Sequence, residues 1–115
     1  MPEHPILTAV KSQVKDINLP FMMAVHVTIN PSTSVPFEKA FAECIPLTRK
    51  ETGCIAYDLN RSCEEPTKYI NYERWASIAA LDAHLSASHT VKLLTTIASY
   101  VEGSPVIKVY AFAGE

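Results

Sequence analysis

The sequence predicts an α+β fold of the ferredoxin-like class, in which an antiparallel four-stranded sheet carries helices on one face. The first observation behind this is the order of the predicted elements, β-α-β-β-α-β, which follows an N-terminal arm of residues 1–20. The second is the length of 115 residues, enough for one domain with a buried core. The third is the composition, 48% hydrophobic and 19% charged, which is typical of a soluble globular protein. Residues 21–115 are therefore expected to form one domain.

The first half of the chain predicts a helical arm, a strand and a long helix. Residues 1–20 contain prolines and apolar residues at helical spacing, which favours a short helix that covers apolar surface. Residues 21–29 form the first strand, and both of its faces are largely apolar. Apolar residues from 37 to 48 mark one helix face, in which Pro46 should produce a kink or a split. Gly53 is placed to end this helix.

The middle of the chain predicts a hairpin. Residues 54–61 and 68–75 are the second and third strands, joined by a polar turn. Helices on one face of the sheet leave the other face bare, although the strands carry apolar residues on both sides. We therefore expect a homodimer in which two such faces pack together through an isologous interface.

The last part of the chain predicts two helical stretches and a strand. Ser77 can cap the first stretch, and Ser88 can cap the second. Gly103 would close the second helix, because Pro105 cannot continue it. Residues 106–112 then alternate in polarity as the fourth strand.

Charge and cysteine content exclude several classes of protein. The net charge is −2 and no basic block exists, so nucleic-acid binding has no electrostatic basis. No apolar run approaches the ~20 residues of a membrane span, and no charged segment with an apolar core suggests a secretory signal. Three cysteines at spacings of ten and nine fit neither a disulfide framework nor a zinc motif. We expect reduced thiols in a cytoplasmic protein.

The most informative stretch runs from Tyr72 to His89. It contains the only tryptophan, Trp75, at the end of a strand, and then a short helix that carries His84. An aromatic N–H, a carboxylate and imidazoles within one strand–helix unit can bind a small organic molecule and move its protons. This stretch therefore predicts a pocket.

Four segments together resemble the antibiotic biosynthesis monooxygenase family, and most closely its quinol-monooxygenase-like members. They are Gly53 to Leu59, Glu73 to Trp75, Leu81 to Leu85, and Ser88-His89. The resemblance covers residues 21–112 and rests on the ordered combination of the segments.

The resemblance implies a dimeric α/β barrel with one pocket in each subunit. It also implies oxidation of a phenol or quinol by O₂ without metal, flavin or haem. Other relatives isomerise small metabolites or degrade haem. The haem-degrading branch uses a tryptophan where this chain has His84, and a first-strand asparagine that His26 does not match. Haem degradation is therefore not expected. No cofactor is expected either.

A cofactor-free oxygenase needs a base near neutral pH, donors for an oxyanion and a dry aromatic cavity. His84 is the expected base, because imidazole titrates near neutral pH. Glu73 shares a strand face with Trp75. If this face meets the helix that carries His84, Glu73 is expected to hold His84 in one tautomer. Asn71 lies on the same face and can donate to an oxyanion, while Trp75 lines the pocket or donates its N–H. The alternatives are a structural His84 bonded to a backbone carbonyl, core packing for Trp75 and a solvated Asn71.

Further pocket residues are expected around this base. They are Tyr57, Tyr72, His26 and His89. On one continuous helix, His84 and His89 would point about 140° apart, so the pair is a poor metal site and no metal is expected. A break between residues 86 and 88 would bring both toward one cavity; the alternative is a helix capped by Ser88 with His89 on the surface.

Two other functions remain open from the sequence. One is a metabolite isomerase on the same scaffold, which consumes no O₂. The other is a non-catalytic ligand-binding or stress-response dimer in which His84 is structural. The expected partners are a small aromatic or quinol-type substrate, O₂ and a second copy of the chain.

Overall fold

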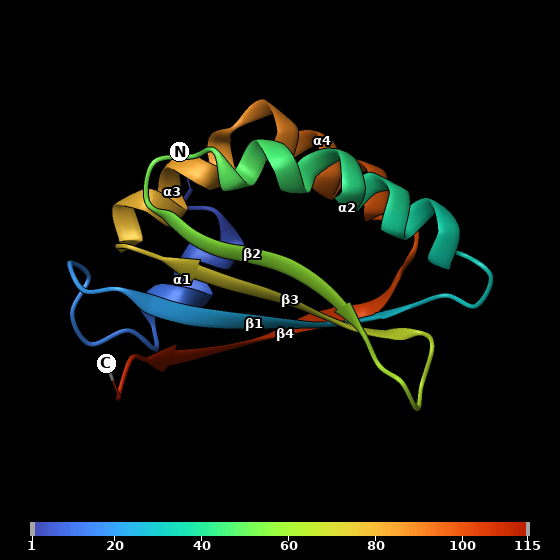
Figure 1. The fold of residues 1–115 in the computed structure, drawn as a ribbon, viewed down its shortest axis with the longest axis horizontal. Helices are drawn as coiled ribbons and strands as arrows, with labels where there is room; N and C mark the ends of the chain where they lie inside the picture. Colours follow the sequence, from blue (N-terminus) through green and yellow to red (C-terminus); the bar gives the residue numbers. More distant parts are fainter. Residues whose placement is uncertain (1, 115) are drawn as a thin grey trace.

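Four strands form one antiparallel sheet in the order β2-β3-β1-β4, and the helices lie on one of its faces (Figure 1). The computed structural model describes residues 2–114. The expected ferredoxin-like order is confirmed, with the last helical region in two pieces. The sheet is open within one chain, since β2 and β4 are edge strands. The elements are α1 Pro5–Lys11, β1 Phe21–Ile29, α2 Ser34–Arg49, β2 Cys54–Arg61, β3 Lys68–Trp75, α3 Ile78–Ser86, α4 Ser88–Ile97 and β4 Val101–Ala111.

The core lies between the sheet and the helices. Alternate residues of the central strands β1 and β3 face it, and the register sets Met23 opposite Glu73 and Val25 opposite Asn71. Because side chains alternate along a strand, Asn71, Glu73 and Trp75 share this inner face. All three are buried, at 6%, 5% and 0% exposure. The helices therefore cover the face that carries the polar groups singled out in the sequence.

Helix α2 runs without a split through Pro46. Proline lacks an N–H, so the carbonyl of Ala42 loses its usual helical partner at this position. Both residues are exposed, which allows water to satisfy that carbonyl. The helix ends at Arg49, four residues before Gly53. Gly53 instead supports the turn into β2, where its φ is +89°.

Helices α3 and α4 are separated by one extended residue. Ser77 caps α3 as expected, because its hydroxyl accepts the N–H of Ala80 at 3.2 Å. Ala87, with φ −65° and ψ 141°, ends α3 and begins α4. The expected cap at Ser88 is wrong: Ser88 is the first helical residue, and no side chain caps α4. The chain thus changes direction between His84 and His89.

Strand β4 begins earlier than expected. Helix α4 ends at Ile97, and Gly103 and Pro105 lie inside the strand from Val101 to Ala111. The pairing with β1 shifts between His26 and Thr28, which marks a bulge opposite these residues. Edge strands tolerate proline and glycine at bulges, so residues that usually stop a helix are accommodated in a strand here.

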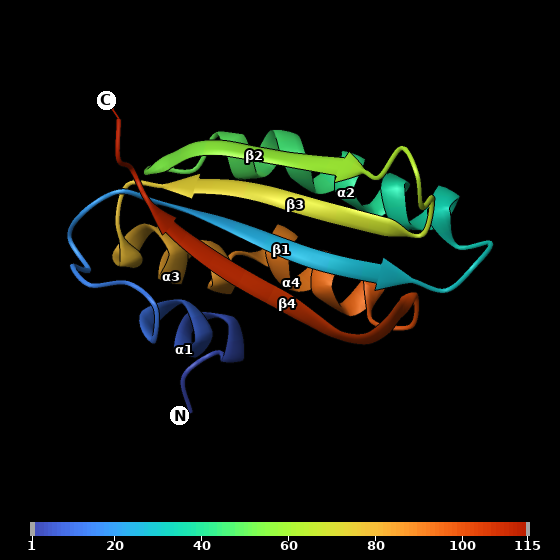
Figure 2. The ribbon, with the colours of Figure 1, turned by 90° about the horizontal axis from the view of Figure 1, so that it is seen from below.

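The N-terminal arm forms a helix that packs beside β4 and α3 (Figure 2). Leu7 and Val10 of α1 are buried in the core. Gln13 then binds the edge of β4, donating to the carbonyl of Ile107 at 3.0 Å and accepting the N–H of Val109 at 3.1 Å. The arm covers apolar surface, as expected. None of the helices in residues 2–114 combines the length and apolar character needed to cross a membrane.

Candidate active site

A cavity of about 310 Å³ lies between the inner face of the sheet and the helices. Its wall is mostly apolar, which is typical of a site for a small organic ligand. The polar or aromatic side chains expected in the pocket that do line it are Tyr57, Asn71, Glu73 and His84. Helix α1 contributes Pro5, Ile6 and Ala9 to the wall.

His84 sits on the buried face of α3. Leu81 and Leu85 lie on the same face of the helix and anchor it in the core. His84 is 3% exposed. The centroid of its imidazole ring lies 4.7 Å from the ring centroid of Trp75 and 5.4 Å from that of Tyr57. Burial lowers the pKa of His84, while its hydrogen bond to a carboxylate acts in the opposite direction. The ring is therefore neutral near pH 7.

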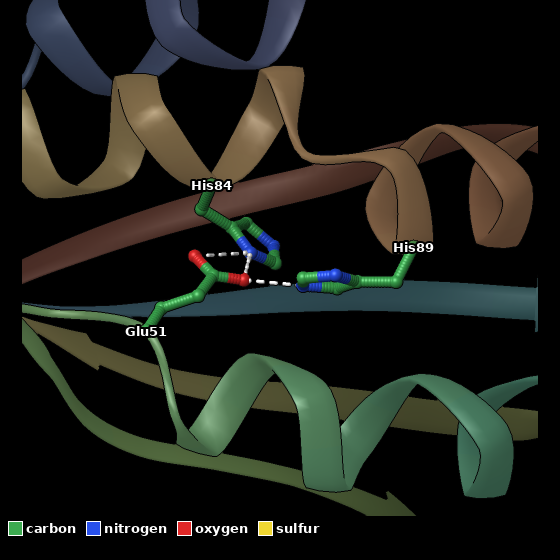
Figure 3. A group of neighbouring side chains, drawn as sticks. All are labelled: Glu51, His84 and His89. Atoms are coloured by element: carbon green, nitrogen blue, oxygen red, sulfur yellow. Dashed lines mark hydrogen bonds and ion pairs between the residues drawn. The ribbon is translucent and has the colours of Figure 1, made fainter.

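The carboxylate bonded to His84 belongs to Glu51, in the turn after α2 (Figure 3). Glu51 Oε2 lies 2.9 Å from His84 Nδ1 and 2.5 Å from His89 Nε2. Because a carboxylate only accepts, His84 carries its proton on Nδ1 and His89 on Nε2. Among residues 2–114, Nε2 of His84 has no hydrogen-bond partner, and Figure 3 shows it turned away from Glu51. His84 thus presents an unprotonated nitrogen on the side away from Glu51.

Glu73 does not make the expected contact with His84. Its Oε1 accepts the indole N–H of Trp75 at 2.9 Å instead. Glu73 and Trp75 are two residues apart on the same strand face, so their side chains are neighbours and bond to each other. Burial raises the pKa of Glu73 to about 8, although the bond from Trp75 opposes the shift. Glu73 is therefore mainly a neutral carboxylic acid at pH 7, and it lines the cavity.

Asn71 and Tyr57 also line the cavity beside these groups. The Asn71 amide donates to the backbone carbonyl of Asp58 at 3.1 Å, which leaves one amide hydrogen free for a ligand. Burial raises the pKa of Tyr57 well above its ordinary value, so the phenol keeps its proton. Trp75 is fully buried behind this wall and supports Glu73 and His84 from there.

Besides Trp75, three other residues expected in the pocket lie outside the cavity wall. His26 and Tyr72 alternate with the inner residues of β1 and β3, so they face away from the helices. His26 lines a separate, more open hollow of about 450 Å³ on that outer face. His89 lies between α4 and α2, bound to Glu51 and outside the cavity wall. His26 and Tyr72 lie outside the cavity because neighbouring residues of a strand point to opposite faces of the sheet.

The family model described as antibiotic biosynthesis monooxygenase matches residues 20–94. The chain belongs to this family. The match includes the three residues of the Glu51–His84–His89 cluster, and it excludes α1 and β4. None of the curated proteins matches the chain.

Solved structures of other proteins show the same fold, and two of the following three carry the name antibiotic biosynthesis monooxygenase. A protein of that name from Nitrosomonas europaea superimposes with a TM-score of 0.80 at 17% identity, over 86% of this chain and 95% of its own. Another of that name, from Caulobacter crescentus, gives 0.79 at 24% identity, over 85% and 93%. A protein from Shewanella oneidensis is 28% identical with a TM-score of 0.73, over 81% and 90%.

Glu51 is the site residue that the sequence did not reveal. It stands 33 positions before His84, in a turn with no periodic pattern. Gly53 brings this turn close to α3, since a Cβ there would lie 2.6 Å from the Cβ of Ala80. In hindsight the glycine was the available signal, because it marks a close approach of backbone to a neighbouring element.

Proposed function

We propose that this protein is a cofactor-independent monooxygenase that oxidises a small or polycyclic phenol or quinol with O₂, with His84 as general base. The observation that carries the proposal is the placement of His84. One ring nitrogen is held by Glu51, and the residue borders an apolar cavity of about 310 Å³. The membership of a monooxygenase family supports the reaction class.

The proton of the substrate hydroxyl passes to Nε2 of His84. The Nδ1–H bond to Glu51 fixes the tautomer that leaves Nε2 able to accept, and the carboxylate stabilises the imidazolium that forms. Glu51, and not Glu73, is therefore the positioning residue for the base. A deprotonated phenol is more electron-rich and gives an electron to O₂ more readily.

Two donors are available for the resulting oxyanion. Glu73 at pH 7 carries a proton and can donate it in a hydrogen bond, and Asn71 has one amide hydrogen free. Both line the cavity with His84. A neutral acid is suited to this role because an ionised carboxylate would repel the oxyanion.

The overall reaction balances without a further reductant. One ring hydrogen of the hydroquinone is replaced by a hydroxyl group that carries one atom of O₂, and the two original hydroxyl hydrogens are lost, which gives a hydroxyquinone. The second atom of O₂ leaves as water. All four electrons that reduce O₂ come from the substrate, so the protein needs to supply proton transfer, orientation and exclusion of water.

We also propose that the chain acts as a homodimer. Within residues 2–114, the outer face of the sheet has no helix over it (Figure 1). It carries exposed apolar residues on the strands β3 and β4, namely Ile70, Val106 and Tyr110, at 37%, 52% and 50% exposure. Pairing two such faces would cover this surface and complete the barrel implied by the resemblance.

An oxygen electrode with a panel of quinols tests the function. His84→Ala should lower the rate of O₂ consumption on a responsive quinol by on the order of 10²-fold. Ser86→Ala, an exposed substitution in the same helix, is the control and should keep the wild-type rate. Unchanged turnover in His84→Ala removes His84 from the mechanism. Conversion of a substrate without O₂ uptake would indicate the isomerase, and binding without conversion the non-catalytic module.

A further inference from the structure

The Glu51–His84–His89 cluster brings three ligand-type atoms together around Nδ1 of His84. One ligand atom from each of the three residues lies within 4.8 Å of the other two (Figure 3). They come from three different elements, the turn after α2, the end of α3 and the start of α4. A contact between segments so far apart in sequence forms only in the folded chain, so the cluster is preorganised by the fold.

The spacing of the two histidines does not prevent them from sharing a ligand. The angle of about 140° applies only to residues five apart on a continuous helix. Here Ala87 is extended, and α4 starts in a new direction. The N–H of Thr90 donates to the Ala87 carbonyl at 3.0 Å, which fixes the first turn that carries His89. The break therefore lets both imidazoles meet one carboxylate.

The chemistry of these three groups selects a class of ion. Two imidazoles and one carboxylate are a donor set found for zinc, while calcium and magnesium prefer oxygen ligands alone. A zinc ion lies about 2.0–2.2 Å from each donor, which corresponds to donors roughly 3–3.5 Å apart. Glu51 and His84 already stand at 2.9 Å. The side chains of Glu51 and His89 are 16% and 18% exposed, which leaves the ion a path from solvent.

We propose that Glu51, His84 and His89 bind a divalent transition-metal ion, zinc being the natural one, and that this ion switches off the His84 base. The second part rests on the proposed function. The ion would take the Nδ1 lone pair of His84, so that the ring proton moves to Nε2. His84 then donates from Nε2 and cannot accept a proton from a substrate there. Neither Glu51 nor His89 lines the cavity, so the ion acts through His84 and does not touch the substrate.

Cobalt(II), added alone to the metal-free full-length protein, tests the site. We expect one cobalt ion per chain, with the visible absorption of a low-coordinate cobalt complex that zinc abolishes. His89→Gln and Glu51→Gln should weaken binding by on the order of 100-fold or more. His26→Gln is the matched control, because this histidine lies on the outer face of the sheet, and it should keep the cobalt spectrum. Absence of the spectrum, or a spectrum that survives His89→Gln, overturns the site.

Nitrogen-15 spectra of His84 test the switch without any substrate. The proton should lie on Nδ1 in the metal-free protein and on Nε2 after zinc is added. A zinc-loaded protein in which His84 keeps its Nδ1 proton overturns the switch. Failure of the metal-free protein to consume O₂ with any quinol would instead overturn the proposed oxygenase, while the cobalt spectrum still decides the metal site.

Discussion

Replacement of Glu73 by glutamine separates the charge of this residue from its shape. The side chain is 5% exposed and accepts the Trp75 N–H at 2.9 Å. A glutamine carbonyl can accept the same hydrogen bond, so the substitution removes mainly the ability to ionise. Its effect on stability should therefore depend on pH.

The magnitude follows from the pKa of Glu73, which burial raises from 4.5 to about 8. A group with a raised pKa in the folded state stabilises the protein fully below its unfolded pKa and loses that contribution as the pH rises through the folded value. Each pH unit between the two is worth about 1.4 kcal/mol, so wild type should lose up to about 5 kcal/mol between pH 4.5 and 8. Water entering the cavity would reduce this loss, and about 2–5 kcal/mol is expected.

The assay is urea unfolding at a fixed protein concentration from pH 5 to 9, followed by the fluorescence of Trp75. Glu73→Gln and wild type should differ little at pH 5, and the variant should be more stable by the stated amount above pH 8. Glu65→Gln, an exposed carboxyl in the turn before β3, controls for the loss of one charge and should stay within about 0.5 kcal/mol of wild type. A Glu73→Gln difference that is constant from pH 5 to 9 would refute the reasoning.

Three other results are expected. Gly53→Ala should lower the free energy of unfolding by about 2–4 kcal/mol in urea titration, because φ is +89° and the new Cβ would lie 2.6 Å from Ala80; an unchanged midpoint contradicts the close approach. Leu7→Ala should cost about 2–4 kcal/mol and expose the arm to limited proteolysis, and a wild-type digestion rate would count against its packing. Sedimentation at micromolar concentration should give twice the chain mass of 12.7 kDa, with Tyr72→Glu shifting the protein to monomer; a wild-type monomer removes the dimer.

The strands were predictable from the sequence because each depends on local alternation. Residues 21–29, 54–61 and 68–75 form strands with the expected bounds. The fourth strand was predicted to start five residues too late, because Gly103 and Pro105 are local stop signals for a helix. Only the pairing of β4 with β1 shows that Gly103 and Pro105 lie in a strand, at a shift of register.

The site was predictable only in its local part. The shared face of Glu73 and Trp75 follows from strand geometry, and so does the buried position of His84 on its helix. The partner of His84 was assigned to Glu73, whereas Glu51 makes the contact from 33 positions away. Such a contact depends on how α2, α3 and their turns pack, and a pattern within one segment carries no information about it.

The cavity wall has two origins. The groups proposed for chemistry lie within residues 20–94, which the family model matches, while Pro5, Ile6 and Ala9 belong to the arm that it does not. The arm is joined to the edge strand by the two bonds of Gln13 and packs through Leu7 and Val10. Under the proposed function, the arm shapes one part of the substrate pocket, while the proton-transfer groups come from a separate stretch of chain. Exchanging the arm offers a way to evolve or engineer new substrate ranges while the proton-transfer machinery stays untouched.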